Sequence, residues 1–519
     1  MASGKSAVEL TEAEIKPTMA SSSAIHVESD SMPAVSAEQK PSMDHVLLRS
    51  IAWTGASKWA TQLLTWTSTI IAARLLSPSD YGVMGMATMY LGFINLVSEF
   101  GLGQSVITLR LLTRRQIAQI NSTSLILGCG FFAASAAMAT SVGHFFHSPQ
   151  LSAVILVMSF GFLISGFQVV PDALLQRELR FKRIASFDTA RALTQSLSTV
   201  LLAWFGFGYW SLAFGSLSGT ALYTLLVVVS SRHSFAWPSL REIKASLSFS
   251  AHVLGSRVAW YTYSNSDFLV AGRVLGESSL GIYTIAWTMA STPVEKLANM
   301  VMKVTPAFFA AVQHDKVQLR RYLLGITEGL SLLCFPASIG LALVADQFVL
   351  AVLGPKWIGA TTPLRLLALY AALRSITTLL PNLLNAMQRS RFVMWNTIVA
   401  AIVFPGSFYL TSRWGTAGIA ATWIVLYPCI TAPLVWRTMC ELDLSIRRYL
   451  ASMFPAMRAC VVMALAVCGA RILMPLQWPV LSRLLVAVAV GGITYVGFVL
   501  GVERERMRGA IALARGACA

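Results

Sequence analysis

The feature that most restricts the fold of this chain is a long series of apolar segments. From Ile51 to Gly501, segments of roughly twenty mostly apolar residues alternate with short polar breaks. A helix of this length crosses a hydrocarbon core of ~30 Å and satisfies its own backbone hydrogen bonds in lipid. The sequence therefore predicts an all-α, polytopic membrane protein with about fourteen transmembrane helices. The predicted spans are 51–75, 82–109, 118–142, 150–171, 185–206, 209–230, 247–271, 281–305, 322–344, 362–384, 392–411, 416–436, 450–473 and 479–501.

The amino-acid composition excludes an ordinary soluble protein. Hydrophobic residues make up 55% of the chain and charged residues only 12%, which is too little charge for a surface exposed to water. The formal net charge is +17, and in a soluble chain this excess would suggest a nucleic-acid partner. Here the cations separate the apolar segments instead of forming one basic face, so we expect membrane lipids and no nucleic acid as partners.

The distribution of Lys and Arg over the polar breaks predicts the orientation in the membrane. The breaks at 144–150, 205–210 and 474–479 contain neither residue. The alternate breaks are rich in both, and by the positive-inside rule they face the cytoplasm, as do both termini. The cationic breaks contain Arg110, Arg114, Arg115, Arg177, Arg180, Lys182, Arg183, Arg232, Arg241, Lys244, Lys316, Arg320, Arg321, Arg389, Arg391, Arg437, Arg447, Arg448, Arg504, Arg506 and Arg508.

Two stretches of the sequence match each other at one constant offset. Internal duplication of membrane helices is characteristic of secondary transporters. Six predicted spans separate the two copies, and this even number indicates parallel repeats related by an axis along the membrane normal. The matched pairs are Ser57 and Ser256, Lys58 and Arg257, Thr65 and Ser264, Arg74 and Arg273, and Gly82 and Gly281.

The duplication defines the predicted domain organisation. Residues 1–44 are rich in Ala, Ser, Glu and Pro without an apolar run, so they are expected to form a disordered cytoplasmic tail and not a secretory signal. The longest outer loop, 344–363, is expected to form a short surface helix and a turn at Gly354-Pro355. The predicted parts are the tail, an N-terminal six-helix lobe at 45–245, a C-terminal six-helix lobe at 246–448, two additional transmembrane helices at 449–502 and a cytoplasmic tail at 503–519.

Polar side chains at helical spacing mark the first span of each repeat as a candidate binding surface. An ionisable group in a membrane span is costly unless it meets water or a partner, so such residues are functional candidates. In each repeat the two basic residues lie about 24 Å apart along the helix, near opposite membrane faces. Facing stripes from the two repeats would line a polar cleft with positive rims. The candidate substrate-binding residues are Lys58, Gln62, Thr65 and Arg74 in the first repeat, and Arg257, Tyr261, Asn265, Asp267 and Arg273 in the second.

Two interpretations of these residues stay open at this point. The four basic residues could instead lie at the membrane interfaces and extend toward lipid headgroups. Asp267 lies near the middle of its span, where we expect it to face an aqueous cavity or to pair with Arg257 or Arg273. Asp267 and Glu99 are the candidates for ion coupling. Glu295 follows Pro293, so a kink could turn it inward.

Sequence motifs of common enzymes and cofactor sites are missing. The chain has no phosphate-cradling Gly-x-x-x-x-Gly-Lys-Ser/Thr loop, no HExxH and no Cys/His spacing typical of zinc, so neither a cofactor nor a metal is expected. The seven cysteines fall in predicted spans or on the cytoplasmic side, so no disulfide is expected. The loops are too short to hold the cytosolic domain of an ATP-driven pump or a glycosyltransferase, and we expect no enzymatic activity.

Four sequence stretches carry a resemblance to a known family. They are Ala73-Arg74-Leu75-Leu76-Ser77-Pro78-Ser79-Asp80-Tyr81-Gly82, then Gly272-Arg273-Val274-Leu275-Gly276 after Asp267, Leu280-Gly281-Ile282-Tyr283, and Leu353-Gly354-Pro355-Lys356-Trp357. In their order, spacing and predicted side of the membrane, these stretches resemble the polysaccharide transporter family of the MOP flippase superfamily, in particular its Wzx-like exporters. The likeness extends from about residue 45 to residue 502.

The resemblance implies a fold, a substrate and a cellular location. The fold would be V-shaped with two lobes, in the bacterial inner membrane. The activity would be alternating-access transport of undecaprenyl-diphosphate-linked oligosaccharide repeat units for exopolysaccharide or lipopolysaccharide. A polysaccharide polymerase and export machinery are the implied candidate partners. Cations suit a diphosphate, and Gln, Asn, Thr and Tyr suit a glycan in a hydrated cleft.

Two other classes of protein remain as alternatives. A multidrug-extrusion exporter usually has about twelve helices, and the extra helix pair and the cationic stripes speak against it. An O-antigen polymerase or ligase would need a large outer loop rich in Arg and His, whereas the outer loops here are short.

Overall fold

The computed structural model describes most of the chain beyond residue 60. The described residues are 61–98, 112–231, 234–237, 257–302, 315–475 and 477–502, with single residues at 103, 106, 107, 309 and 312. All of them belong to one compact unit, Trp53–Ala519. The predicted disordered tail, Lys58 and Glu99 lie outside the described residues.

Every element in the described part of the chain is a helix. A helix at residues 61–75 precedes the others in the N-terminal half, and a helix at 257–270 opens the C-terminal half. The remaining helices of the N-terminal half are α2 (Pro78–Ser98), α4 (Arg114–Phe146), α5 (Pro149–Arg177), α6 (Phe181–Trp204) and α7 (Tyr209–Ser230). Those of the C-terminal half are η1 (Ala271–Leu275), α9 (Gly276–Met302), α11 (Lys316–Leu343), α12 (Ala345–Phe348), η2 (Val349–Leu353), η3 (Pro355–Ala360), α13 (Thr361–Thr377), α14 (Leu379–Ala386), α15 (Ser390–Thr411), η4 (Ser412–Trp414) and α16 (Gly415–Glu441). Two more helices follow, α17 (Ile446–Leu473) and α18 (Val480–Val502).

The helix content confirms the predicted polytopic all-α fold. Among the described residues, nine segments are long and apolar enough to cross a membrane, and one of them, Ser390–Glu441, contains both α15 and α16. The exact number of fourteen spans stays a prediction, as do the lobe boundaries. The loop at 344–363 forms the short helix α12 and a turn at Gly354, whose φ of 103° suits glycine.

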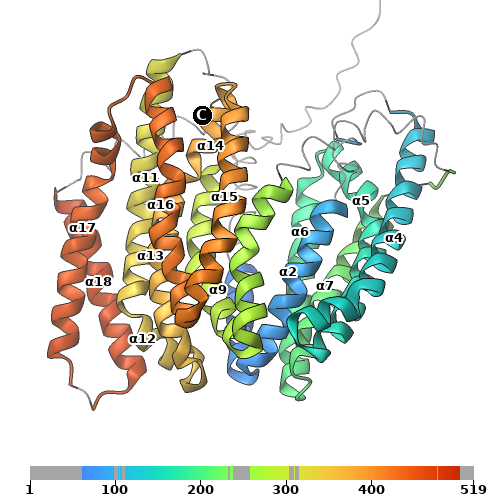
Figure 1. Cartoon of the computed structure of the whole chain (residues 1–519), viewed down its shortest axis with the longest axis horizontal. Coiled ribbons are helices and arrows are strands. Elements are labelled where there is room, and N and C mark those ends of the chain that lie inside the picture. Colours follow the sequence, from blue (N-terminus) through green and yellow to red (C-terminus); the bar gives the residue numbers. More distant parts are fainter. Residues whose placement is uncertain are drawn as a thin grey trace, which may run out of the picture. The chain divides into compact units, whose positions relative to one another are not determined.

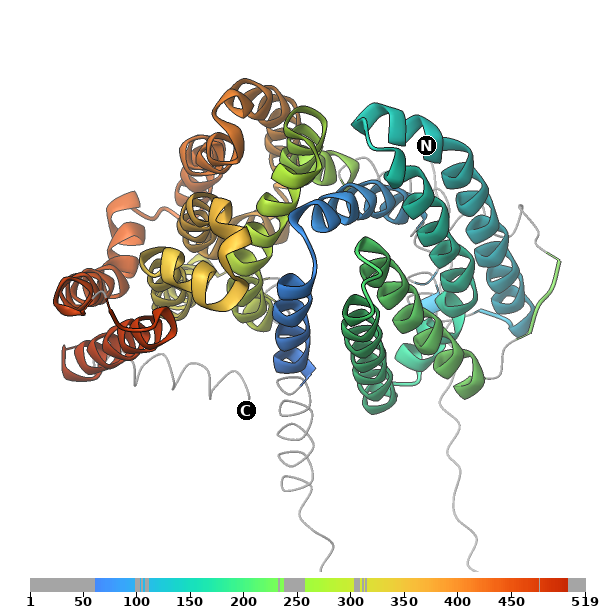
Figure 2. The same cartoon turned by 90° about the horizontal axis from the view of Figure 1, so that it is seen from below.

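The helices form two groups that meet through α2 and α9. In the N-terminal half, α4 packs on α5, α6 on α7, and α5 on α7. In the C-terminal half, α13 packs on α9, α11 and α16, and α15 packs on α16. Figure 1 shows α9 between the two groups, and Figure 2 shows the helices of residues 61–98, drawn in blue, at the junction.

At one end of the molecule, the two halves share a single apolar core. One buried cluster contains residues of both halves, among them Tyr81 and Phe146 from the N-terminal half and Tyr283 and Trp357 from the C-terminal half. The halves therefore join in a common core near the turn at Gly354. We call this end of the molecule the closed end.

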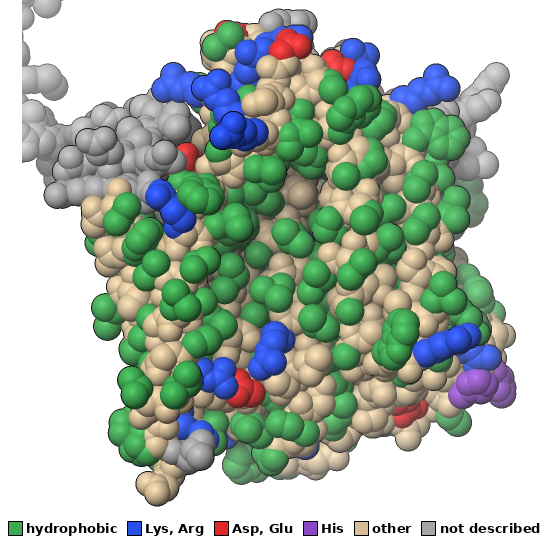
Figure 3. Space-filling model, turned by 60° about the vertical axis from the view of Figure 1, so that its left-hand side comes forward, with side chains coloured by type: hydrophobic (Ala, Val, Ile, Leu, Met, Phe, Trp, Pro, Cys, Tyr) green, Lys and Arg blue, Asp and Glu red, His purple; other side chains and the backbone are tan. Residues whose placement is uncertain are grey.

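At the opposite end the described halves have separate cores. One cluster holds residues of the C-terminal half together with α17 and α18, including Leu323, Leu379 and Met453. Two small clusters around Val170 and Tyr223 belong to the N-terminal half alone. We call this end the basic end, because Lys and Arg side chains gather along the corresponding upper edge in Figure 3, above a broad belt of hydrophobic side chains.

The last two helices are attached to the C-terminal half through α11. α17 packs on α11 and on α18. Arg471 of α17 donates to the carbonyl of Leu343, at the end of α11, and to Asp346. In α18, the Tyr495 hydroxyl donates to the Leu332 carbonyl at 2.8 Å. These contacts attach the pair to the C-terminal half, while the predicted division of the chain into two lobes and an additional helix pair stays a prediction.

Candidate functional site

The closest approach between the two halves is the crossing of α2 and α9. A Cβ atom on Gly82 would lie 1.8 Å from the carbonyl oxygen of Glu277, and one on Gly281 would lie 1.7 Å from that of Pro78. Each glycine thus faces the carbonyl four residues before the other glycine, so the contact is reciprocal. Gly82 and Gly281 are matched partners in the sequence repeat, and small residues let membrane helices approach this closely.

Arg74 extends from the N-terminal half to the end of a helix in the C-terminal half. Its Nε donates to the carbonyl of Val352 at 2.7 Å, and its Nη2 donates to that of Ala351. These carbonyls belong to the last turn of η2, where the helix itself supplies no donor. A cation at a helix C-terminus is also favoured by the helix dipole.

Arg273, the repeat partner of Arg74, makes the corresponding contact in the opposite direction. Its Nη1 donates to the carbonyl of Phe145 in the last turn of α4, in the N-terminal half, and to the ring of His147 at 2.6 Å. Each repeat therefore caps a helix of the other with the same arginine. In this structure both guanidinium groups bind backbone carbonyls, and their predicted role in a polar cleft stays a prediction.

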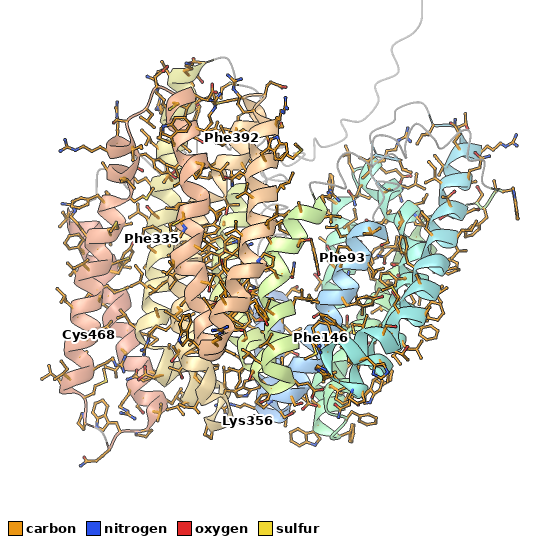
Figure 4. All side chains as sticks on the ribbon, viewed as in Figure 1. Phe93, Phe146, Phe335, Lys356, Phe392 and Cys468 are labelled. Atoms are coloured by element: carbon orange, nitrogen blue, oxygen red, sulfur yellow. The ribbon has the colours of Figure 1, made fainter. Side chains whose placement is uncertain are left out.

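Lys356 and Trp357 extend the contact between the halves. The Lys356 ammonium donates to the carbonyls of Arg74 and Leu76, at 2.7 and 2.5 Å, and the Trp357 Nε1 donates to that of Ala73 at 2.8 Å. They satisfy the final carbonyls of the helix at 61–75, while Arg74 satisfies carbonyls of η2. Lys356 lies at the lower extremity of the molecule in Figure 4.

A ring of hydrogen bonds completes this contact around the start of α2. The Ser79 hydroxyl donates to Glu277 Oε2 at 2.7 Å, across the two halves. Asp80 Oδ1 accepts from the backbone N–H of Tyr209 at 2.9 Å, and its Oδ2 accepts from the Ser77 hydroxyl at 2.7 Å. We define the clasp as the residues whose side chains join the two halves at the closed end, namely Arg74, Ser79, Arg273, Glu277, Lys356 and Trp357.

Asp267 lies beside the clasp, inside the C-terminal half. It is 0% exposed, and its Oδ2 accepts from the Tyr283 hydroxyl at 2.7 Å and from Trp423 Nε1 at 3.0 Å. Its Oδ1 accepts from the backbone N–H of Phe268 at 2.9 Å. The expectation that Asp267 faces an aqueous cavity or pairs with Arg273 is therefore not met, because neutral donors from α9 and α16 enclose the carboxyl group.

The remaining predicted site residues lie along the same junction. The Thr65 hydroxyl donates to the carbonyl of Thr61 at 2.9 Å, within its own helix, and Gln62 is half-buried beside it. Tyr261 crosses to α2, where its hydroxyl donates to the Met89 carbonyl at 2.7 Å.

Two further predicted residues lie on the helix at 257–270. The Asn265 amide donates to the Tyr261 carbonyl at 3.0 Å, and Arg257 is exposed at the basic end of the helix. In the described part of the stripes, Thr65, Tyr261 and Asn265 thus donate to backbone carbonyls of the protein.

The sequence analysis missed one ion pair inside the membrane. Arg374 Nη1 of α13 lies 2.9 Å from Glu295 Oε1 of α9. The available signal was an arginine within an otherwise apolar span, together with an acidic residue that follows Pro293. Among the described residues, no group of three His, Cys, Asp or Glu side chains could hold a metal ion.

Comparisons with known proteins agree with this architecture. A family model described as "Polysaccharide biosynthesis protein" matches residues 71–362, which is more than half of the chain. The chain is 26% identical to the succinoglycan biosynthesis transport protein ExoT of Rhizobium meliloti over 90% of its own length and 95% of that protein. It is 28% identical to the lipopolysaccharide biosynthesis protein WzxC of Escherichia coli over 62% of its own length and 65% of that protein.

A solved structure supports the fold independently of sequence. The lipid II flippase MurJ in an inward closed conformation superposes with a TM-score of 0.70 at 11% identity, covering 88% of this chain and 100% of that chain. These findings confirm the family resemblance and establish a multi-pass membrane protein. The chain belongs to the polysaccharide biosynthesis protein family.

Proposed function

We propose that this protein is a flippase of the bacterial inner membrane that moves undecaprenyl-diphosphate-linked oligosaccharide repeat units to the outer leaflet. The product would serve exopolysaccharide or lipopolysaccharide synthesis. The family membership supports this proposal, as do the names of the relatives, one a transport protein of succinoglycan biosynthesis and one a lipopolysaccharide biosynthesis protein. Transport, and not catalysis, is the activity that these relatives suggest.

The observation that carries the mechanism is the reciprocal clasp. Two repeats that each cap a helix of the other at one end, and that have separate cores at the other end, can rock about their contact. Such movement of one repeat against the other is the basis of alternating access. In our proposal the clasp closes one side of the substrate route in the present conformation. It opens in a second conformation, in which the basic end closes.

The orientation in the proposal follows from charge. The basic end carries the cationic loops at Arg177–Lys182, Arg389–Arg391 and Arg447–Arg448, so we assign it to the cytoplasm, with both termini. The closed end then faces the periplasm. In the present conformation the protein would accept the lipid-linked substrate from the cytoplasmic leaflet, where the repeat unit is assembled on its lipid.

The predicted site residues keep assigned roles in this proposal. Lys58, Gln62, Thr65, Arg257, Tyr261 and Asn265 would line the substrate route, while Arg74 and Arg273 would hold the clasp and become available to substrate when it opens. Asp267 would couple the movement to an ion, because a carboxyl group enclosed by neutral donors is sensitive to a bound proton or cation. The substrate, membrane lipids and a polysaccharide polymerase with its export machinery would be the partners.

Deletion of the gene tests the proposal. Loss of surface polysaccharide, with undecaprenyl-linked repeat units accumulating in the cytoplasmic leaflet, is the expected result. Repeat units that reach the outer leaflet but stay unpolymerised would indicate a polymerase instead. Unchanged polymer with altered drug sensitivity, in a strain without a second flippase, would indicate a multidrug exporter.

A further inference from the structure

An ion pair lies deep within the C-terminal half, far from the clasp. Arg374 is about 20 Å of helix rise from Thr361, where α13 begins near the closed end. It lies well inside Pro355–Ala386, a segment that is long and apolar enough to span a membrane. Its partner Glu295 lies in the half of α9 that points toward the basic end. A charged pair at this depth needs a physical reason, because transfer of charge into a membrane is costly.

Protein does not cover this pair completely. The Arg374 side chain is 32% exposed and the Glu295 side chain 44% exposed. The apolar cluster beside them includes Val294 and Ile376 and, among the described residues, no member from the N-terminal half. α9 nevertheless lies between the two groups of helices, packed on α2 as well as on α13 (Figure 1). The pair is therefore partly accessible from outside the protein, on a helix that also contacts the N-terminal half.

The Arg374 guanidinium has unused hydrogen-bonding capacity. It carries five N–H groups in a planar fork, and the hydrogen bond to Glu295 uses one of its nitrogens. In the described part of the chain, Nε and Nη2 make no hydrogen bond. The phenol groups of Tyr263, Tyr370 and Tyr427 are close enough to interact electrostatically with the guanidinium. This fork matches the oxygens of a phosphate, and tyrosine hydroxyls can add further donors.

The clasp arginines differ from Arg374 in this respect. Arg74 and Arg273 donate to backbone carbonyls that need a partner, so their guanidinium groups are committed in this conformation. The partner of Arg374 is instead a carboxylate, and a phosphate can replace it because it is also anionic and presents two oxygens to the guanidinium fork.

We propose that Arg374 binds the phosphate group of a prenyl-diphosphate lipid, and that Glu295 occupies the phosphate position while the site is empty. Glu295 keeps the guanidinium paired and oriented within the membrane, since an unpaired cation there would be destabilising. An arriving diphosphate displaces the carboxylate, which then turns toward water. This inference rests on the proposed function and names the side chain that holds the anionic part of its substrate.

Binding of farnesyl diphosphate to the purified full chain in lipid nanodiscs tests the inference. Arg374→Gln should weaken binding at least about tenfold, since it removes charge-assisted hydrogen bonds. Glu295→Gln should strengthen binding, because it removes the competing carboxylate. If the pair had a purely structural role, the two substitutions would not change the affinity in opposite directions. Arg391→Gln, at an exposed arginine of the basic end, is the control for loss of one positive charge and should bind like the wild type.

The double variant Arg374→Gln/Glu295→Gln protects the test against misfolding, because it leaves no unpaired charge in the membrane. Its affinity for farnesyl diphosphate should be as low as that of Arg374→Gln. Equal affinity of the double variant and the wild type overturns the inference. Inorganic pyrophosphate that binds as tightly as farnesyl diphosphate would assign the site to a soluble anion and overturn its lipid part.

Failure of this inference and failure of the proposed function give different results. If diphosphate binding does not depend on Arg374 but gene deletion still traps repeat units in the cytoplasmic leaflet, the proposed phosphate site is wrong and the proposed flippase function is supported. If binding depends on Arg374 but deletion leaves both leaflets unchanged, the site stands and the flippase is wrong.

Discussion

Gly82 and Gly281 lie against each other where α2 crosses α9, and each faces the carbonyl four residues before the other glycine. This reciprocity is the geometry of a local two-fold relation between the repeats. It places the N-terminal ends of α2 and α9, with Ser79 and Glu277, side by side. The two halves can therefore separate at the closed end only if this crossing loosens.

Substitution of either crossing glycine should disturb the closed end. In Gly281→Ala the added Cβ would lie 1.7 Å from the Pro78 carbonyl oxygen, so the helices must move apart. Overpacking of this kind reduces the stability of the packed conformation by about 1–3 kcal/mol. Export should fall, and a cysteine placed at the closed end should react faster with a membrane-impermeant thiol reagent. Gly497→Ala, where a Cβ meets nothing within 4 Å, is the matched control and should export normally.

Removal of one clasp donor should weaken the closed conformation. Trp357→Phe keeps the ring in the buried core but leaves the Ala73 carbonyl without its donor, at a cost of about 1–3 kcal/mol. Distances between spin labels across the closed end should shift toward longer values. Trp414→Phe, at a tryptophan that is 73% exposed, should leave these distances unchanged. The same distances in Trp357→Phe and the wild type would remove Trp357 from the clasp.

The Asp267 carboxyl group should be needed for transport and not for folding. Asp267→Asn keeps the size of the side chain and an oxygen for the Tyr283 hydroxyl, but the amide cannot exchange a proton or hold a cation. The variant should accumulate in the membrane normally and fail to restore surface polysaccharide in a deletion strain. Asp172→Asn is the control, because Asp172 also accepts from a tyrosine hydroxyl, that of Tyr223 at 2.7 Å. Full complementation by Asp267→Asn would exclude ion coupling at this position.

An ion pair at the basic end should give a small pH-dependent contribution to stability. The hydrogen bond from Lys316 holds the pKa of the Asp443 carboxyl below its ordinary value, with a further contribution from Arg320. A depressed carboxyl pKa stabilises the fold above the unfolded-state value of about 3.9, and this stabilisation is lost as the pH falls through the lower folded-state pKa. Asp443→Asn should therefore lower the melting temperature slightly at neutral pH, and its difference from the wild type should narrow only below about pH 4. A constant difference down to pH 2 would contradict this assignment.

The sequence predicts the all-α membrane fold and the internal repeat, because both depend on features that recur at regular spacing. Apolar segment length predicts membrane helices, and the matched positions of Arg74 with Arg273 and of Gly82 with Gly281 indicate a duplication from the sequence alone. The structure adds that the matched glycines touch and that the matched arginines cap helices of opposite halves.

The environment of individual polar residues could not be predicted in the same way. The sequence predicts that Asp267 faces an aqueous cavity or pairs with Arg257 or Arg273. In the structure its side-chain donors are instead Tyr283, on the next long helix, and Trp423, 156 residues away, and both belong to a buried aromatic cluster. The pairing of Arg374 with Glu295 likewise depends on which faces of α13 and α9 meet. Helical spacing defines the face on which a side chain lies but not what covers that face.

The most direct test of the account is to lock the clasp and measure transport. Ser79→Cys and Glu277→Cys, whose native side chains are hydrogen-bonded at 2.7 Å, can be joined by a short thiol cross-linker in a background without the native cysteines. The measured quantity is the appearance of undecaprenyl-linked repeat units in the outer leaflet of spheroplasts. We predict that cross-linked protein does not deliver them and that cleavage of the linker restores delivery. Delivery by the cross-linked protein at the wild-type rate would contradict the claim that the halves must separate at the clasp.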